Sequence, residues 1–350
     1  MNSGPELTGK AILEMVRAFQ PACVLIAGAD LDVFTLLHNR PMTAAALAGR
    51  IKGQPRATEV MLDALAALGM LRKSPKGVYS LPRGLEKVLT EDAAHGILGM
   101  LRHQGTCLRR WGDLAAVVKT GRPAEKRHSV RGPEGDLESF IRAMHEVSTP
   151  LAAPLVTSLG KLRFTRLLDL GGASGTWTIP FLKAAPGARA TIFDLPQVIP
   201  MARRRLRKLG LGARIAFAAG DYNRDAMPGG HDLAWVSAIV HQNSRPQNRA
   251  MFRKVYKALV SGGRILIRDV VVDATRTRPV HGALFAVNML VGTQGGSTFT
   301  FDELKEDLQS AGFTAVKYLR RGQAMDTVVA ASKPRGRRMT PEAPGIPRAK

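Results

Sequence analysis

The hydrophobic pattern divides the chain into two parts with different periods. In residues 1–110 apolar positions recur at helical spacing, as at Ile12 and Val16, and an apolar segment follows over residues 22–37. From residue 160 onward, short apolar runs alternate with amphipathic segments, as strands alternate with helices. The pattern therefore predicts a mostly helical N-terminal part followed by an α/β part.

Within the N-terminal part, two short helices and a hairpin follow one another. The pattern predicts a helix over residues 44–51, with Thr43 as its N-cap, and a second helix over 58–68. A two-stranded ribbon follows, with strands at 71–73 and 78–81 around a Ser-Pro-Lys-Gly turn. Two helices followed by a hairpin make a winged helix-turn-helix.

This winged helix is not predicted to bind DNA. A recognition helix needs positive charge for the phosphates, and Arg, Asn or Gln for the base edges. The second helix has no Lys or Arg after Arg56, and it carries Glu59 and Asp63. Such a helix suits burial in a core or in a dimer interface, so we expect no nucleic-acid partner.

Residues 95–160 are predicted to be helical and to contribute mostly to a core. Because they come just before the α/β part, the same side chains can also line a substrate pocket. The apolar, aromatic and histidine positions there are His95, Met100, His103, Trp111, Phe140, Met144 and His145. The polar stretch 120–136 contains Gly and Pro and is predicted to be an exposed loop.

The C-terminal part is predicted to hold a sheet. Strands are expected at residues 166–170, 190–194, 214–219, 232–237, 264–271, 315–320 and 327–331. The first of them are continuous apolar runs, as in a parallel sheet with helices over both faces. The predicted fold class is therefore α/β, with a doubly wound sheet that binds its ligand at the carboxyl ends of the strands.

The stretch from Leu167 to Pro196 is the strongest indication of a ligand. A strand ends in the glycine-rich turn 169–175, and a helix and a second strand that ends at Asp194 follow. Glycines let the backbone approach a ligand closely, and an acid about twenty residues further on can accept hydrogen bonds from a ribose diol. The turn lacks the Gly-Lys-Ser/Thr of a P-loop, so the pattern predicts a nucleotide-like cofactor.

Further polar residues fall at other strand ends. Asp221 can accept a hydrogen bond from an exocyclic amine, and the Tyr222 ring can stack on a purine. His241 lies just before a helix that Ser244 is predicted to cap, and a histidine there can act as a general base near neutral pH. Asp269, which ends the next strand, can bond the second ring nitrogen and stabilise the imidazolium.

Length and composition bound these hypotheses. The 350 residues suffice for two or three domains, and no membrane span, signal peptide or metal site is predicted. Cys23 and Cys107 are interpreted as reduced thiols of a cytoplasmic protein. The net charge of +23 is scattered over helices and loops, as on a solvated surface, although an anionic partner stays open. The Pro-, Gly- and Arg-rich segment from Lys333 is predicted to be disordered.

The ordered blocks resemble one protein family. LLDLGGASG, IFDLPQVI and AGDYN resemble the cofactor motifs of class I S-adenosylmethionine-dependent O-methyltransferases, of the plant caffeate type and its bacterial small-molecule relatives. SAIVHQNS, GGRILIRD and MLVGTQGGSTFTFDELKEDLQSAGF resemble that family's later blocks, and residues 41–81 resemble its dimerisation domain. The resemblance covers roughly residues 10–332.

The resemblance implies a domain order. A mostly helical winged-helix dimerisation domain would precede a Rossmann-like, doubly wound, seven-stranded sheet whose last strand is antiparallel. The dimerisation domain would cover residues 1–110, a helical linker and substrate-pocket region 111–160, the cofactor-binding catalytic domain 161–332, and a basic tail 333–350. A homodimer formed through the first domain follows from the same resemblance.

The resemblance also assigns roles to individual residues. His241 matches the catalytic base, and Asp269 matches a glutamate that flanks it. S-adenosylmethionine would be bound by Asp169, Gly171, Gly172, Gly175, Asp194, Leu195, Asp221, Tyr222 and Ser237. The methyl acceptor would be bound by Trp111, Phe140, Met144, Asn288, Met289 and Thr293, with the two methionines clamping an aromatic ring.

The chain departs from the plant members of that family at four positions. Ala173 replaces the middle glycine of the first motif, and an alanine is strained there if the position needs a positive φ. Ser237 stands where plant members carry a lysine that touches the cofactor. Gln242 replaces an aspartate, and Thr298 replaces a glutamate.

The leading hypothesis is an enzyme that methylates a hydroxyl, expected to be phenolic, of a small aromatic or polyketide-like metabolite. Three alternatives stay open: a protein of this fold with lost or altered chemistry, a winged-helix nucleic-acid-binding regulator, and an NAD-dependent enzyme built on the same βαβ unit. The blocks AGDYN and SAIVHQNS do not suit the last of these. The sequence does not identify the acceptor.

Overall fold

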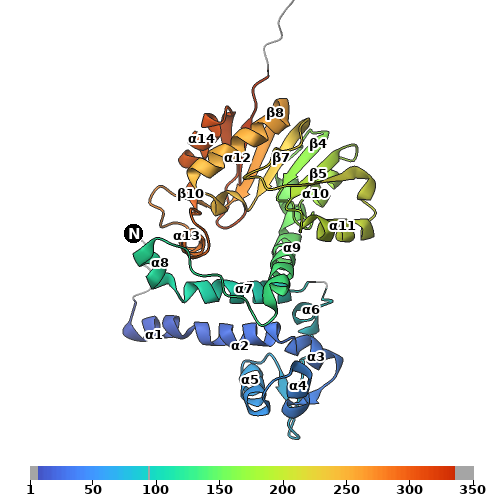
Figure 1. Cartoon of the computed structure of the whole chain (residues 1–350), viewed down its shortest axis with the longest axis vertical. Coiled ribbons are helices and arrows are strands. Elements are labelled where there is room, and N and C mark those ends of the chain that lie inside the picture. Colours follow the sequence, from blue (N-terminus) through green and yellow to red (C-terminus); the bar gives the residue numbers. More distant parts are fainter. Residues whose placement is uncertain (1–6, 94, 336–350) are drawn as a thin grey trace, which may run out of the picture. The chain divides into compact units, whose positions relative to one another are not determined.

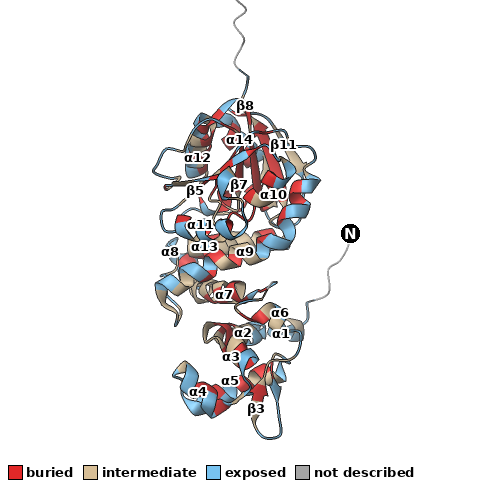
Figure 2. Ribbon diagram, turned by 90° about the vertical axis from the view of Figure 1, so that its right-hand side faces the viewer, coloured by how far each residue is buried: buried red, intermediate tan, exposed pale blue. Residues whose placement is uncertain are grey.

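The computed structural model describes residues 7–93 and 95–335, which form two compact units (Figure 1). Of the described residues, the first unit comprises 7–93, 95–154 and 290–292, and the second comprises 155–289 and 293–335. Buried residues, red in Figure 2, occur in both units, and each unit has its own hydrophobic core.

The first unit is mostly helical. It begins with α1 (Gly9–Arg17), α2 (Phe19–Asp30) and α3 (Val33–Asn39), and later includes α6 (Glu86–Leu89), α7 (Leu98–Trp111), α8 (Leu114–Thr120) and most of α9 (Gly132–Ser158). Its core is apolar, with Phe34, Leu62 and Leu65 completely buried.

The winged helix predicted in this unit is confirmed. α4 (Ala44–Ile51) is capped by Thr43, whose side chain accepts a hydrogen bond from Ala46 N, and α5 (Pro55–Ala67) follows. The ribbon consists of β2 (Arg72–Lys73) and β3 (Val78–Ser80), with β1 (Met42–Thr43) as a third strand. α5 begins before the predicted residue 58 because Gln54 caps it and Pro55 has a φ suited to a first helical turn.

One acid of α5 fastens the ribbon to the helix. Asp63 accepts hydrogen bonds from Lys73 Nζ and from Tyr79 Oη, both at 2.6 Å. The bond from Lys73 in particular holds the pKa of Asp63 below its usual value. The acid that made DNA recognition improbable from the sequence therefore has a packing role.

The second unit is built on a seven-stranded sheet with the order β11-β12-β8-β7-β4-β5-β6 (Figure 1). Strands β4 to β8 run parallel, and the last strand, β12, is antiparallel to both of its neighbours, as predicted. The bounds are β4 (Arg166–Leu170), β5 (Arg189–Asp194), β6 (Ile215–Ala219), β7 (His231–Ser237), β8 (Leu259–Asp269), β11 (Thr314–Arg320) and β12 (Thr327–Ser332).

Helices connect these strands and cover both faces of the sheet. They are α10 (Thr178–Ala184), α11 (Ile199–Lys208), α12 (Arg245–Ala258) and α14 (Phe301–Ser310), whereas α13 (Val280–Gly292) lies between β8 and α14 in the chain. Trp235 of β7 packs on Phe181 of α10, with ring centroids 5.0 Å apart, whereas the next residue, Val236, shares a core with Phe252 of α12. Successive residues of a strand point to opposite faces, so α10 and α12 cover different faces and the sheet is doubly wound, as predicted.

Shorter elements complete the second unit. Two 3-10 turns lie at Gly212–Arg214 and Val240–Gln242, and β9 (Val271–Val272) pairs in parallel with β10 (Phe299–Thr300). Ser244 caps α12 as predicted, in a capping box with Gln247.

Two further predicted boundaries are wrong. α9 begins at Gly132 with a proline next to it, which suits a first helical turn, so the loop predicted over 120–136 ends earlier. β8 begins at Leu259 and not at residue 264, because Leu259 pairs with His231 at the start of β7. Residues 336–350 of the predicted tail lie outside the described residues.

One described segment has the length and the apolar composition needed to cross a membrane. It is Gly9–Asp30, which covers α1 and α2 near the N-terminus. The indication is weak, since core helices of soluble proteins meet the same criteria. The segment also carries Lys10, Glu14 and Arg17 in its first half.

Candidate active site

The glycine-rich turn after β4 has a left-handed backbone at Gly171 (φ 63°), Ala173 (φ 43°) and Gly175 (φ 72°). A Cβ atom on Gly171 would lie 2.3 Å from Ile239 Cδ1, and one on Gly172 would lie 2.9 Å from Asp169 Cγ. The turn therefore keeps its shape only with glycine at these two positions. Its bare backbone forms a cradle at the carboxyl end of β4.

Ala173 has the positive φ that the sequence analysis identified as a strain. A left-handed conformation costs a residue with a Cβ roughly 1–2 kcal/mol. The Ala173 N–H donates to Asp194 Oδ2 at 2.7 Å, and this bond helps to hold the strained residue in place.

Asp194 ends β5 beside this turn. Its other oxygen, Oδ1, accepts from the N–H of Leu195 at 2.7 Å. Burial raises the pKa of Asp194, whereas the two backbone hydrogen bonds lower it. The carboxylate therefore links the carboxyl ends of β4 and β5. The hydroxyls of a ribose diol could donate further hydrogen bonds to the same two carboxylate oxygens.

Asp169 lies beneath the turn. Its side chain is buried and accepts from Thr178 Oγ1 at 2.5 Å. The pKa of Asp169 is raised to about 7, chiefly by burial; the Thr178 hydrogen bond opposes this shift, and the charge of Asp194 adds to it. The carboxyl group thus ties the turn to the first residue of α10.

Asp221 and Tyr222 follow β6 and form a local hydrogen-bonded group. Asp221 Oδ1 accepts from Asn223 N at 2.8 Å, and Tyr222 Oη donates to Asn243 Oδ1 at 3.3 Å. Lys254 Nζ donates to the Tyr222 carbonyl at 2.9 Å. The sequence analysis missed Asn243 and Lys254, since only the fold brings them to Tyr222.

His241 and Asp269 form a buried pair. Asp269 Oδ1 is 2.7 Å from His241 Nδ1, and Asp269 Oδ2 accepts from the His241 backbone N–H at 3.3 Å. Both side chains are nearly inaccessible, at 6% and 2% relative exposure. With Nδ1 hydrogen-bonded to a carboxylate, the proton of a neutral imidazole sits on Nδ1, and Nε2 carries the free lone pair. This arrangement suits a general base.

His241 contacts an aromatic ring through its side chain and a neighbouring loop through its backbone. The Phe285 ring meets the imidazole edge to face, with centroids 4.8 Å apart. The His241 carbonyl accepts from Ser297 N at 2.9 Å, so the loop that contains the buried Thr298 packs against the histidine turn. The sequence analysis missed Phe285, which has the character of an ordinary core residue of α13.

Ser237, at the end of β7, accepts a hydrogen bond at 3.0 Å from Nη1 of Arg268. Arg268 is 3% exposed, and its guanidinium carbon lies 4.4 Å from the centroid of the Trp177 ring. Burial lowers the pKa of Arg268 to about 10. The sequence analysis did not assign Arg268 to the site.

The residues predicted to bind the acceptor are divided between the two units. In the second, Met289 is buried, and Thr293 Oγ1 donates to the Met289 carbonyl at 2.8 Å and accepts from Gly296 N at 2.9 Å. Asn288 belongs to the same helix and also has a partner. The first unit contributes Trp111, Met144 and Phe140.

Phe140 meets His103 edge to face with centroids 5.1 Å apart, and burial lowers the pKa of His103 to about 4.

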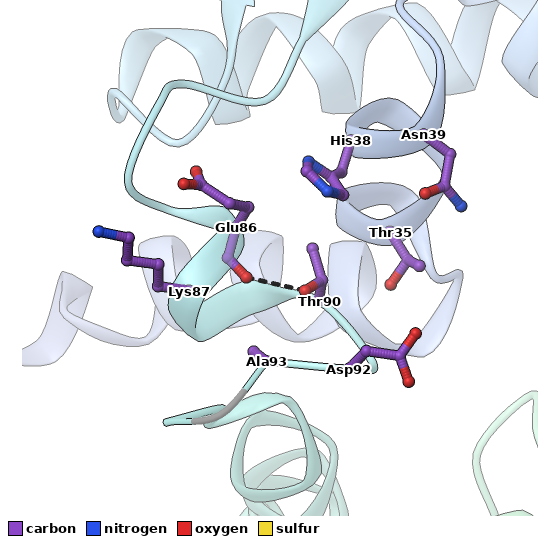
Figure 3. A pocket seen from close by; sticks show the side chains of 8 residues that line it. All are labelled: Thr35, His38, Asn39, Glu86, Lys87, Thr90, Asp92 and Ala93. Carbon is purple, nitrogen blue, oxygen red and sulfur yellow. Dashed lines mark hydrogen bonds between the residues drawn. The ribbon is translucent and has the colours of Figure 1, made fainter.

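A separate hollow in the first unit holds none of the predicted site residues. Its volume is about 350 Å³, and it is lined by Thr35, His38, Asn39, Glu86, Lys87, Thr90, Asp92 and Ala93 (Figure 3). Thr90 Oγ1 donates to the Glu86 carbonyl at 2.8 Å. Within residues 7–93 and 95–335 there is no cluster of three or more potential metal ligands.

Comparison with known proteins places the chain in a family. A family model described as the O-methyltransferase domain matches residues 111–314, and one described as the O-methyltransferase dimerisation domain matches residues 13–83. The chain therefore belongs to the O-methyltransferase family.

Relatives along nearly the whole chain agree with this assignment. The tetracenomycin polyketide synthesis 8-O-methyl transferase TcmO of Streptomyces glaucescens is 30% identical over 93% of this chain and 96% of its own. The 3-hydroxy-5-methyl-1-naphthoate 3-O-methyltransferase of Streptomyces sahachiroi is 30% identical over 85% and 87%. The crystal structure of human N-acetylserotonin methyltransferase in complex with SAM (S-adenosylmethionine) is 26% identical, with a TM-score of 0.78 over 95% of this chain and all of that one.

The protein is thus an S-adenosylmethionine-dependent O-methyltransferase of the small-molecule type. The residues present fit that cofactor: the turn 171–175 leaves its backbone bare at glycines whose Cβ atoms would collide with Ile239 and Asp169, and acids end or follow the next two strands. The alternative of an NAD-dependent enzyme is set aside, because the family and its relatives use S-adenosylmethionine.

Proposed function

We propose that the protein methylates a phenolic hydroxyl of a small aromatic or polyketide-like metabolite, with His241 as the general base. The observation that carries this proposal is the His241–Asp269 pair, in which a buried carboxylate lies 2.7 Å from Nδ1. The names of the two streptomycete relatives support a polycyclic or naphthoate-like acceptor.

In this proposal the cofactor lies across the carboxyl ends of β4, β5 and β6. Gly171, Gly172 and Gly175 bring the backbone close to it, Asp194 and Leu195 hold the ribose, and Asp221 and Tyr222 hold the adenine. Asp169 acts indirectly, by holding the turn through Thr178. When bound, S-adenosylmethionine supplies a methyl group on a positively charged sulfur.

The chain itself supplies proton removal and orientation. His241 Nε2 takes the proton of the acceptor hydroxyl, and Asp269 stabilises the imidazolium that forms. The pKa of a free phenol is about 10, so few acceptor molecules are ionised at neutral pH and a base contributes on the order of a hundredfold or more. Opposite charges are neutralised as the methyl group moves to oxygen, so burial beside Phe285 favours the reaction.

Within the second unit, the acceptor is expected to contact Met289, Asn288 and Thr293. The Thr293 hydroxyl already has both a donor and an acceptor within its own loop. We therefore assign Thr293 chiefly to shaping the wall, and Met289 to contact with the aromatic ring. For Trp111, Phe140 and Met144 of the first unit, acceptor binding stays a prediction from the sequence.

The experiment that tests the proposal compares His241→Ala with wild type. S-adenosylhomocysteine release is measured with a panel of hydroxynaphthoates, hydroxyanthraquinones and catechols, and S-adenosylmethionine binding is measured by calorimetry. We expect turnover to fall at least a hundredfold while the cofactor dissociation constant stays within a few-fold. His281→Ala is the matched control, because His281 stacks on the same Phe285 ring but is exposed.

Near-full turnover of His241→Ala with a phenolic acceptor would show that another group is the base. Turnover only with amines or thiols would show that the phenolic acceptor class is wrong. Absence of turnover with every acceptor, despite tight cofactor binding, would favour the alternative of a methyltransferase fold with altered chemistry.

We also propose that the enzyme is a cytoplasmic homodimer formed through the dimerisation domain. None of the residues of α1 is buried. Its apolar side chains, among them Leu13, Met15 and Val16, are exposed. A second copy of the chain would remove this apolar surface from water. The free thiols of Cys23 and Cys107 suit a reducing compartment.

A further inference from the structure

Arg268 is a buried cation that makes no ion pair with any described residue. It is 3% exposed, and its only hydrogen bond to the described chain is the 3.0 Å bond from Nη1 to Ser237 Oγ. Its Nε is buried without a hydrogen-bond partner among these residues. The guanidinium stacks on Trp177, at 4.4 Å from the ring centroid.

A buried charge of this kind requires an explanation. Taking a cation out of water is unfavourable unless an anion or several hydrogen bonds compensate for the lost hydration. One hydroxyl and one aromatic face leave most of the guanidinium donors unused. Burial lowers the pKa of Arg268 only to about 10, because the more distant charges of Asp269 and Asp326 oppose the shift, so the group stays charged at neutral pH. A ligand that brings an anion would complete the site.

The position of Arg268 in the sheet indicates which ligand. Ser237 and Arg268 are register partners at the carboxyl ends of β7 and β8. β7 lies next to β4, and the strand order reverses between these two strands, since β5 and β6 lie on one side and β7 and β8 on the other. Ligands of doubly wound sheets bind in the crevice at this reversal. Trp177 belongs to the segment that continues the glycine-rich turn into α10.

The direction of the cofactor follows from the groups proposed to hold it. Asp194 ends β5 and Asp221 follows β6, so the ribose and adenine lie over that half of the sheet. The amino-acid end of the cofactor then lies toward β4 and β7, on the side of Ser237 and Trp177. The α-carboxylate at that end is the one anionic group of S-adenosylmethionine, and a guanidinium fork matches a carboxylate geometrically.

We propose that Arg268 binds the α-carboxylate of S-adenosylmethionine, with Ser237 and Trp177 holding its guanidinium in place. The inference rests on the proposed pose of the cofactor, and it is independent of whether His241 is the base. It makes Arg268 a cofactor-binding residue and Ser237 a positioning residue that acts through it.

The binding test uses two ligands and no methyl acceptor, and acceptor kinetics of the same variants are measured separately. S-adenosylhomocysteine and its decarboxylated analogue, S-adenosyl-3-thiopropylamine, differ only in the carboxylate. Their dissociation constants are measured by calorimetry for wild type, Arg268→Met and Arg268→Lys. Arg264→Met is the matched control, because Arg264 lies on the same strand and donates to the Arg163 carbonyl.

We expect wild type and Arg264→Met to prefer S-adenosylhomocysteine by about 10- to 100-fold, the range for hydrogen bonds to a charged group. Arg268→Met should lose this preference, binding the decarboxylated analogue within about threefold of wild type. Arg268→Lys should keep part of the preference, since it retains the charge but lacks the planar fork. Binding of the analogue itself shows that the variant is folded.

Other results would overturn the proposal. An equal loss of affinity for both ligands would make Arg268 a structural support of the Trp177 segment. An unchanged preference in Arg268→Met, with a raised Michaelis constant for hydroxynaphthoates but not for neutral phenols, would assign the guanidinium to an acidic acceptor. An unchanged preference and unchanged acceptor kinetics would leave the cation–π contact as its only role.

Discussion

The N–H of Ala173 donates to Asp194 Oδ2 at 2.7 Å and thereby joins the glycine-rich turn after β4 to the carboxyl end of β5. Ala173 has a positive φ of 43°, so this bond is made by the one turn residue with a Cβ in the left-handed region. The same carboxylate is proposed to hold the ribose. Its loss would therefore affect both the shape of the turn and the binding of the cofactor.

Asp194→Ala is expected to weaken S-adenosylmethionine binding by about a hundredfold or more, because charged hydrogen bonds to the ribose and the Ala173 bond are both lost. Calorimetric titration of wild type and variant measures this. Asp225→Ala is a control, because Asp225 accepts from Asp221 N in the neighbouring loop. Equal affinity of Asp194→Ala and wild type would mean that the cofactor does not contact this strand end.

Ala173→Gly is expected to stabilise the protein by roughly 0.5–1 kcal/mol. Relief of a left-handed alanine gains roughly 1–2 kcal/mol, and the added freedom of glycine in the unfolded chain removes part of that. Urea unfolding of the apo protein measures the difference. Ala190→Gly, at a buried position of β5, should instead destabilise it. A destabilised Ala173→Gly would show that the left-handed conformation carries no strain.

Asp269→Asn is expected to lower the turnover number by about 10²- to 10⁴-fold while cofactor affinity stays unchanged. The amide is uncharged and can donate to Nδ1, which would place the proton on Nε2 and block the base. Turnover and calorimetric binding are measured on the same preparation. A variant that keeps turnover within a few-fold of wild type would contradict the orienting role of Asp269.

Asp169 should make stability depend on pH in a direction unusual for an acid. Its pKa in the folded protein, about 7, lies above the ordinary value of 3.8, because the group is buried. The folded state therefore binds the proton more tightly than the unfolded chain does. The stability contributed by this group is full below about pH 4 and decreases as the pH rises toward 7.

Asp169→Asn removes this titration. We compare the free energy of unfolding of the variant with that of wild type at each pH. Between pH 4 and pH 7 the difference, variant minus wild type, should increase by a few kcal/mol, on the order of 1.4 kcal/mol for each unit by which the pKa is raised. Urea unfolding at a series of pH values measures it. The amide oxygen can still accept from Thr178 Oγ1, so the local bond is kept. A difference that stays constant with pH would contradict the raised pKa.

The exposed apolar side chains of α1 predict a dimer interface that acidic substitutions on this helix would weaken. Leu13 and Val16 are 57% and 63% exposed, and burial of each in an interface contributes roughly 1.5–3 kcal/mol. Leu13→Glu combined with Val16→Glu should shift the mass measured by light scattering toward the monomer at micromolar concentration. Arg17→Glu, on the same helix, is the control. A wild-type monomer under these conditions would refute dimerisation through this surface.

Local patterns predicted much of the fold because they depend on neighbouring residues. Thr43 and Ser244 are caps in the structure, since a hydroxyl just before a helix reaches the first free N–H groups. The strands were recognised as apolar runs because both faces of the sheet are covered. Boundaries failed at Pro55, Gly132 and Leu259, where a capping residue, a helix start or a pairing partner outweighs periodicity.

Sequence patterns were enough to predict the α/β class, the glycine-rich turn, and the acids and the histidine at strand ends, because parallel strands bring their carboxyl ends to one edge of the sheet. Only the folded structure shows that Asp269 lies on His241 Nδ1, that Asp63 holds the ribbon, and that Arg268 is buried against Trp177. These contacts join residues far apart in the chain, and a side chain's partner and burial are set by packing that no local pattern encodes.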